Sequence, residues 1–202
     1  MGISREALRY NFQFLILTLA VRLWIPAERR RVINALGLKP GDSVLDHCSG
    51  LGGNLAPLCA AISPGGRVNA MDNSPAMVRA ASRLATRRRL PVTVEKADAM
   101  ALPYPDDAFD AVMHTGAINQ FGDQRQAAMD EILRVTKPGG VICIQDEGMS
   151  TARAATRFGR FLIKQNPMFL DPIPIELVPD GVNARVERVM ADLFFNIVFR
   201  KP

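Results

Sequence analysis

Cysteine is scarce in this chain of 202 residues, and its spacing is uninformative as a ligand pattern. The three cysteines, Cys48, Cys59 and Cys143, are odd in number and lack the spacing of zinc ligands. They therefore predict neither a disulfide framework nor a metal site, and a reducing, cytoplasmic environment fits them best.

Long apolar runs are also missing. The run from Phe12 to Val21 is interrupted by Gln13 and Thr18, so it is too short to span a bilayer. No small-residue cleavage site follows it, which argues against a signal peptide. We interpret residues 1–25 as an apolar helix that packs on the protein or lies at a membrane surface.

The overall composition is that of an ordered globular protein. Hydrophobic residues make up 48% of the chain and charged residues 22%, which is enough to build one core in a single domain over residues 1–202. The net charge of +5 permits acidic partners. The arginine triplets at 29–31 and 87–89 are nevertheless typical of solvated helix faces and helix ends.

Predicted strands and helices alternate along the chain, without repeats or low-complexity segments, which favours an α/β fold with a mainly parallel sheet. We expect helices at 26–36, 54–62, 75–89 and 151–164, and strands at 43–46, 67–72, 91–97, 109–113 and 141–145. Two β-rich runs at 184–191 and 193–199 predict an antiparallel pair. Ser74 is expected to cap one helix, and Asp123 another that turns Ala127, Ile132 and Val135 toward the sheet.

The segment VLDHCSGLGGN, residues 44–54, is the most informative motif. An apolar strand ends at Asp46, and glycines at 50, 52 and 53 lead into a helix. Glycine lets the backbone approach a ligand closely, and open parallel sheets bind ligands beyond the carboxyl ends of their strands.

A second carboxylate, Asp72, closes the next strand 20 residues after Gly52, where it can accept hydrogen bonds from ribose hydroxyls. The same spacing suits a dinucleotide. That alternative is disfavoured because Leu55 stands where the last glycine or alanine of the dinucleotide motif belongs.

With three further stretches, the chain resembles the class I methyltransferases, especially the branch of quinone C-methyltransferases and small-molecule methyltransferases. These stretches are MDNSPAMV (71–78), ADAMALPYPDDAFDAVM (97–113) and EILRVTKPGG (131–140). The resemblance covers about residues 27–145. It implies a Rossmann-like, doubly wound seven-stranded sheet, mostly parallel with one antiparallel C-terminal strand and helices on both faces. One departure is Cys48, which replaces the first glycine of the family's glycine motif.

The resemblance also implies S-adenosylmethionine as cofactor and S-adenosylhomocysteine as product. By analogy, Asp46 and the backbone from Cys48 to Gly52, including Gly50, would hold the methionine part of the cofactor. Asp72 would accept from the ribose hydroxyls.

The adenine contacts follow in the same way. Asn73 and Met77 would flank the ring, Asp98 would accept from its amino group, and the Ala99 amide would donate to a ring nitrogen. For Asp98 the alternative is a simple loop cap.

Catalytic candidates lie after the later strands. His114 follows the fourth strand, where the family's sites face the methyl group; it is a candidate general base or cofactor contact that can titrate near neutrality, or it only shapes the pocket. His47 is expected to fix the turn. Asp146 and Glu147 bind substrate or cap the chain, and without a third ligand at suitable spacing they predict no metal.

The acceptor is expected to be a small, apolar molecule methylated on oxygen, nitrogen or carbon. The N-terminal helix, as a lid, and the stretch from Phe161 to Leu170 are the available apolar walls. Alternatives are a lipid or quinone methyltransferase at the membrane surface and a non-catalytic protein that binds the cofactor. No Asn-Pro-Pro-aromatic signature follows the fourth strand, so nucleic acid is not an expected partner. The pattern does not predict an oligomeric state.

Overall fold

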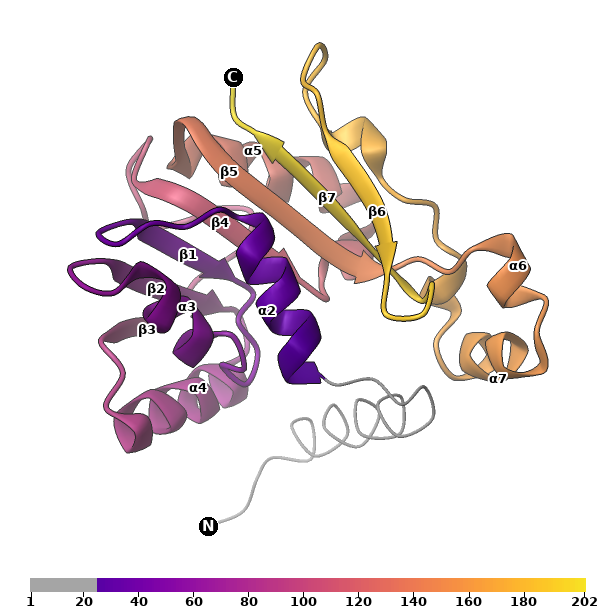
Figure 1. Cartoon of the computed structure of the whole chain (residues 1–202), viewed down its shortest axis with the longest axis horizontal. Helices are drawn as coiled ribbons and strands as arrows, with labels where there is room; N and C mark the ends of the chain where they lie inside the picture. The colour runs from indigo at the N-terminus through magenta and orange to yellow at the C-terminus, as the bar shows by residue number, and fades with distance from the viewer. Residues whose placement is uncertain (1–24) are drawn as a thin grey trace.

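The computed structural model describes residues 25–202 (Figure 1). The predicted N-terminal lid and its membrane contact fall on residues outside this range and stay predictions. Among the described helices, none has the length and hydropathy needed to cross a membrane.

A seven-stranded sheet forms the centre of the fold, in the order β3-β2-β1-β4-β5-β7-β6. The strands are β1 Ser43–His47, β2 Arg67–Asp72, β3 Val92–Lys96, β4 Phe109–Thr115, β5 Thr136–Glu147, β6 Arg185–Val189 and β7 Phe194–Arg200. β7 runs antiparallel to both of its neighbours, and the pairings among β1 to β5 are parallel. The predicted sheet, including its one antiparallel C-terminal strand, is confirmed.

The strand order reverses between β1 and β4. Connections from β1 run outward to β2 and β3, and the chain then returns to place β4 on the other side of β1. Open α/β sheets bind ligands at such a switch point, beyond the carboxyl ends of the strands. His47 and His114 are register partners there.

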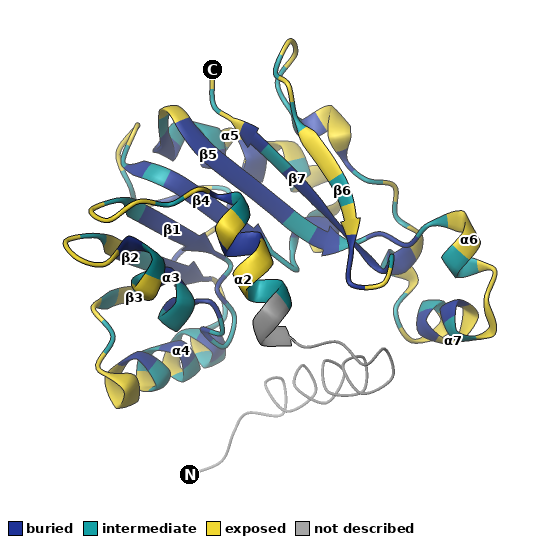
Figure 2. Cartoon of the chain, viewed as in Figure 1, coloured by how far each residue is buried: buried dark blue, intermediate teal, exposed yellow. Residues whose placement is uncertain are grey.

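Helices cover both faces of the sheet (Figures 1 and 2). The α-helices are α2 Ile25–Ala35, α3 Leu55–Ile62, α4 Pro75–Arg88, α5 Arg125–Val135, α6 Thr151–Ala154 and α7 Arg157–Gln165. The 3₁₀ helices are η1 Ile118–Gln124, η2 Pro167–Leu170 and η3 Ile175–Leu177. Helices α2, α3 and α4 pack on one face through residues such as Ile33, Leu58 and Ala81. Helix α5, η1 and η3 pack on the other through Ile132, Ile118 and Leu177.

The hydrophobic pattern explains this double covering. Alternate residues of a strand point to opposite faces. In β1, Val44 therefore joins the α2–α4 side and Leu45 the α5 side, and both are fully buried. A central strand that is apolar on both faces needs a helical layer on each.

Several local predictions are wrong. Asp123 lies in η1 rather than at the helix cap, because the chain breaks at Gly122, and α5 begins only at Arg125. As a result Ala128 is buried where Ala127 was expected. Ser74 occupies the N-cap position of α4 without a side-chain cap hydrogen bond.

The predicted helix at 151–164 is also divided. It forms α6 and α7, because the Thr156 side chain accepts a hydrogen bond from the Gly159 amide and begins a new helix.

Candidate cofactor site

The loop after β1 is shaped by residues with positive φ. Cys48, Gly50 and Gly52 have φ values of 59°, 54° and 78°. A Cβ at Gly52 would lie 2.8 Å from Leu55 Cδ1 and 3.1 Å from Ala81 Cβ, so only glycine fits between the loop and α4. A Cβ at Gly50 would meet nothing within 4 Å, which leaves this part of the loop open to a ligand.

Asp72 joins the loops after β1 and β2. Its Oδ2 accepts from the Gly50 amide and its Oδ1 from the Ser74 amide, both at 2.9 Å. Its residue exposure is 8%. The structure thus brings together the strand-end carboxylate and the glycine loop that the sequence assigns to one nucleoside site.

Asp46 is fully buried next to this loop. Its Oδ1 accepts from Asn54 Nδ2 at 3.2 Å, while Oδ2 has no hydrogen-bond partner within residues 25–202. Burial raises the pKa of Asp46 to about 7, although the Asn54 hydrogen bond and the charge of Arg29 act in the opposite direction. A cationic group of a ligand would satisfy this carboxyl.

Arg29 is a site residue that the sequence analysis missed. The triplet at 29–31 was interpreted as a solvated helix face, yet a Cβ on Gly53 would lie 2.3 Å from Arg29 Nη2. The guanidinium therefore lies against the glycine loop. The only sequence signal was its position at the start of a helix just before β1.

The predicted adenine contacts lie on neighbouring segments. Asn73 is exposed beside Asp72, whereas Met77 and Ala99 are buried. Asp98 is exposed, and its Oδ1 accepts from the Met100 amide at 3.0 Å. Asp98 therefore does form the loop cap considered from the sequence, and its contact with adenine stays a prediction.

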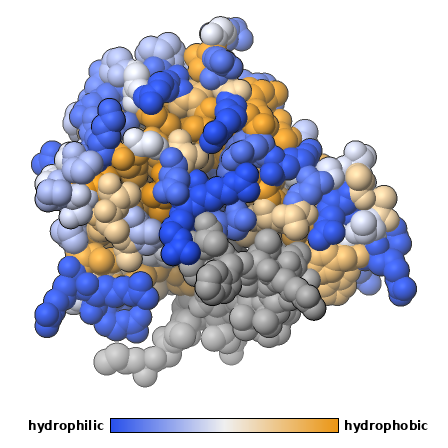
Figure 3. Space-filling view, in the orientation of Figure 1, coloured by the Kyte–Doolittle hydropathy of each residue, from blue (hydrophilic) through white to orange (hydrophobic). Residues whose placement is uncertain are grey.

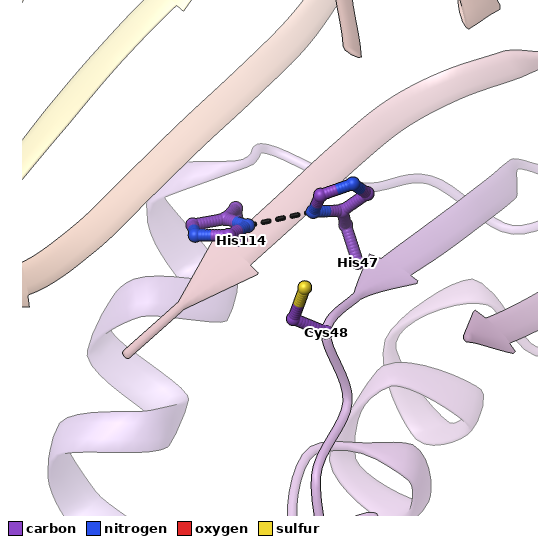
Figure 4. A group of neighbouring side chains, drawn as sticks. All are labelled: His47, Cys48 and His114. Atoms are coloured by element: carbon purple, nitrogen blue, oxygen red, sulfur yellow. Dashed lines mark hydrogen bonds between the residues drawn. The ribbon is translucent and has the colours of Figure 1, made fainter. Parts of the chain in front are cut away.

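Two buried histidines meet at the switch point between β1 and β4 (Figure 4). The Nδ1 atoms of His47 and His114 are 2.6 Å apart, and both residues are fully buried. Phe121 of η1 lies against His114, with ring centroids 5.7 Å apart. His47 pairs with His114 instead of only fixing the turn, a contact that depends on strand order and is not visible in the sequence.

Both imidazoles are held in the neutral form. Burial lowers the pKa of His47 to about 4, against smaller opposing effects of the Ala99 backbone and Glu131. Burial, together with the charge of His47, lowers the pKa of His114 well below its usual value. The expectation that His114 titrates near neutrality therefore does not fit its burial.

Asp146 serves the fold at the end of β5. Its Oδ2 accepts from the Asn119 amide and its Oδ1 from the Glu147 amide, both at 2.8 Å. Burial and the adjacent Glu147 raise its pKa. Of the two roles considered from the sequence, the structure shows the capping one. Glu147 reaches farther along this edge, where its Oε1 accepts from Asn166 Nδ2 at 3.2 Å.

Unsatisfied polar atoms concentrate at this edge of the sheet. Within the described residues, most of the buried side-chain atoms without a hydrogen-bond partner follow the carboxyl ends of β1, β4 and β5: Asp46 Oδ2, His47 Nε2, Ser49 Oγ, His114 Nε2, Asn119 Oδ1 and Glu147 Oε2. Each such atom costs about 1–3 kcal/mol unless a ligand or water satisfies it. The edge therefore has the chemistry of a binding site for a polar molecule.

A different feature lies toward the other end of the strands. Apolar side chains gather over β5 and β7 on the face shown in Figure 3, near a shallow hollow lined by Leu36, Val182 and Phe199 among others. The hollow contains none of the unsatisfied atoms named above, so it is not part of the candidate site.

The strand order, the glycine loop and the carboxylates at the ends of β1 and β2 define a class I, Rossmann-like methyltransferase fold. The family described as a methyltransferase domain matches residues 44–140, and the chain resembles the quinone methyltransferases of this class.

The similar proteins include demethylmenaquinone methyltransferases. That of Thermus thermophilus is 38% identical over 116 residues, which cover 57% of this chain and 52% of the relative. That of Mycobacterium sp. (strain JLS) is 34% identical over 163 residues, covering 80% and 65% respectively. The chain thus spans about half to two thirds of the length of these relatives.

Among solved structures, a SAM dependent methyltransferase from Aquifex aeolicus aligns with a TM-score of 0.66 at 23% identity. The alignment covers 86% of this chain and 89% of the other. At this identity the likeness establishes the fold.

Proposed function

We propose that the chain binds S-adenosylmethionine at the carboxyl edge of the sheet and transfers its methyl group to a small apolar acceptor, leaving S-adenosylhomocysteine. The observation that carries the proposal is the fully buried Asp46, whose Oδ2 has no hydrogen-bond partner among residues 25–202, next to a glycine loop that is open at Gly50. The cofactor's ammonium group would pair with the Asp46 carboxyl, and the cofactor would approach the backbone closely at Gly50.

The residues of the edge divide the work of binding. Asp46 and the backbone from Cys48 to Gly52 would hold the methionine part, and Asp72 would accept from the ribose. Asp72 is already oriented by two backbone amides, so little ordering is needed when a ligand binds. Asn73, Met77, Asp98 and Ala99 would surround the adenine.

The chemistry needs little from the protein beyond alignment. When bound, the sulfonium supplies an electrophilic methyl group, so the chain mainly positions the acceptor in line and excludes water. Residues after β4 and β5 would do this, with His114 buried beneath them. A base at His114 is optional and would help only a phenol or an acidic carbon.

Apolar side chains near this edge support an apolar acceptor. Phe161 and Leu170 are 48% and 58% exposed on α7 and η2. The name of the relatives suggests a demethylmenaquinone-like quinol as the first acceptor to test. A cytoplasmic protein that touches the membrane through its N-terminal segment would reach such an acceptor.

Calorimetry on the full chain tests cofactor binding. Asp72→Ala should weaken S-adenosylmethionine binding by about 1.5–3 kcal/mol, the scale of hydrogen bonds to charged groups. Asp130→Ala, an exposed change on α5, is the matched control and should leave binding unchanged. Equal affinity of wild type and Asp72→Ala would remove Asp72 from the site.

Catalysis needs a separate measurement. Labelled methyl from the cofactor should appear in a demethylmenaquinone analogue or another apolar acceptor. Tight cofactor binding without transfer to any acceptor would favour the alternative of a non-catalytic binding protein.

A further inference from the structure

Three metal-ligating side chains converge at the switch point of the sheet (Figure 4). His47 and Cys48 are adjacent at the end of β1, and β1–β4 pairing places His114 beside them. One ligand atom from each, two imidazole nitrogens and the Cys48 sulfur, lies within 4.8 Å of the others. This cluster was not predicted from the sequence. The cysteine spacing and the Asp146–Glu147 pair gave no sign of it, because His114 is far from His47 and Cys48 along the chain.

The backbone at Cys48 supplies an independent observation. Its φ of 59° lies in the left-handed region, where a non-glycine residue costs roughly 1–2 kcal/mol. Glycine would remove this cost, and the resembling family usually has glycine here. A strained residue that persists in a ligand-binding loop points to a role for its side chain.

The two imidazoles are arranged as ligands before any metal arrives. Both rings are fully buried, and a neutral imidazole can bind a cation through its unprotonated nitrogen. Their Nδ1 atoms face each other, and the Nε2 atoms have no hydrogen bond within the described residues. With a cation between the Nδ1 atoms, each ring would carry its proton on Nε2.

We propose that His47, Cys48 and His114 form a three-ligand site for a zinc ion, with a fourth position open to water or to an anionic atom of a bound small molecule. Two nitrogens and one sulfur are ligands that zinc prefers, and three protein ligands with an open position are typical of catalytic zinc. The four ligands of a tetrahedral zinc ion lie roughly 3.3–3.6 Å apart, so zinc binding would move the two nitrogens farther apart than 2.6 Å and bring the sulfur closer to them.

The surrounding charges suit a cation. Asp46 is fully buried beside the loop that carries Cys48, and Asp72 Oδ2 accepts from the Gly50 amide of the same loop. Carboxylates at these positions attract a divalent ion, whose charge would in turn favour the Cys48 thiolate.

This site goes beyond the proposed methyl transfer and does not depend on it. A zinc-bound His114 would no longer act as a base at Nδ1; the metal, by polarising an acceptor oxygen or sulfur, would take over activation of the acceptor. Metal binding is measured without cofactor or acceptor, so its failure is distinct from failure of the methyltransferase proposal.

Cobalt substitution tests the proposal on the full chain. The protein is stripped with a chelator, titrated with Co²⁺, and read by its thiolate-to-cobalt charge-transfer band; Zn²⁺ competition gives the zinc affinity. We expect one cobalt per chain and a band that Zn²⁺ removes. A wild-type protein without the band would overturn the site.

The informative variant is Cys48→Gly, which deletes the thiol and relieves the strained backbone, so the metal-free variant should unfold at the same or a higher denaturant concentration. It should lose the band, and zinc affinity should fall by more than the roughly 100-fold that loss of an outer-shell partner costs. Cys59→Ser, on α3 outside the cluster, is the control and should keep the band. His114→Gln retains the thiol and should also weaken binding. Retention of the band in Cys48→Gly, or its loss in Cys59→Ser, would contradict the assignment.

Discussion

The carboxyl edge of the sheet and the cluster around Arg134 are opposites in hydrogen bonding. Arg134 of α5 binds both carboxylate oxygens of Glu131 at 2.7 and 2.8 Å and Asp106 at 2.8 Å. It also donates to the Tyr104 and Leu102 carbonyls at 2.8 and 3.1 Å. At the carboxyl edge, by contrast, six buried polar atoms have no partner in the described part of the chain.

The difference separates two kinds of family motif. The Arg134 cluster joins the stretch at 97–113 to the stretch at 131–140, because side chains of the second stretch bind the backbone of the first. In the segment 44–54, by contrast, Asp46 Oδ2, His47 Nε2 and Ser49 Oγ have no hydrogen-bond partner among the described residues. The first arrangement stabilises the fold, whereas the second awaits a ligand.

The largest effect is expected for His114→Gln at the carboxyl edge, which should impair methyl transfer much more than cofactor binding. Turnover at saturating cofactor should fall roughly 100-fold, whether the imidazole acts as a base or binds a metal that activates the acceptor. Cofactor affinity should change little, because the proposed nucleoside contacts lie at and after the ends of β1 to β3. Steady-state kinetics and calorimetry on the same variant measure both constants. Weak cofactor binding with near-normal turnover would instead make His114 a cofactor contact.

Arg134→Met should act on stability alone. The methionine keeps much of the apolar stem but removes the guanidinium that donates to Glu131 and to two backbone carbonyls, and Glu131 keeps only the Leu102 amide as a donor. The free energy of unfolding should therefore fall by about 2 kcal/mol. Denaturant unfolding measures the change, with the exposed Arg87→Met on α4 as control. Cofactor affinity should be unchanged in both variants. A loss of binding in Arg134→Met would break the division between the two regions.

Asp46→Asn should move stability and binding in opposite directions. The amide removes a buried carboxyl whose Oδ2 has no hydrogen-bond partner among the described residues, so the ligand-free protein should gain about 1 kcal/mol of stability while its cofactor affinity falls. Denaturation and calorimetry on one preparation give both values, and Asp130→Asn serves as the matched control. An Asp46→Asn variant that is less stable and binds the cofactor equally well would show that Asp46 stabilises the fold, as the Arg134 cluster does, and does not bind the cofactor.

The smallest effect concerns Asp110, a satisfied surface carboxylate. Burial alone would raise its pKa, but hydrogen bonds from Lys137 and the Ser43 amide outweigh burial and lower the pKa. Its contribution is therefore present above the unfolded value near 3.8 and is lost as pH falls through the folded pKa. Asp110→Asn should cost less than about 1 kcal/mol at pH 7 and less than that at pH 2 to 3. Urea unfolding at both pH values checks this, and an equal cost at both would rule out the ion pair as its source.

The parts of the fold written in local patterns could be predicted from the sequence. Strand β2 ends at Asp72 as expected, and β1 extends one residue beyond the predicted end at Asp46, to His47. The C-terminal antiparallel pair followed from two adjacent β-rich runs. Helix starts were less predictable. The chain breaks at Gly122, so α5 begins at Arg125 and not directly after Asp123, and Thr156 caps a second helix inside a segment that was predicted to be one helix.

The site could be predicted only where its residues lie in or just after strands that the sequence pattern shows to be neighbours. Asp72 and Gly50 were expected together because both follow neighbouring strands. The His47–His114 contact joins residues far apart in sequence and depends on β4 pairing directly with β1. The position of Arg29 against Gly53 depends likewise on how α2 packs, which no local pattern encodes.

Hydrogen exchange with and without S-adenosylhomocysteine tests the central claim most directly, since it reads both regions in one sample. The account predicts new protection at residues 46–54, 72–77 and 98–99, with none around 102–106 and 131–134. Protection that is equal in both regions, or confined to the Arg134 cluster, would contradict the assignment of the unsatisfied edge as the cofactor site.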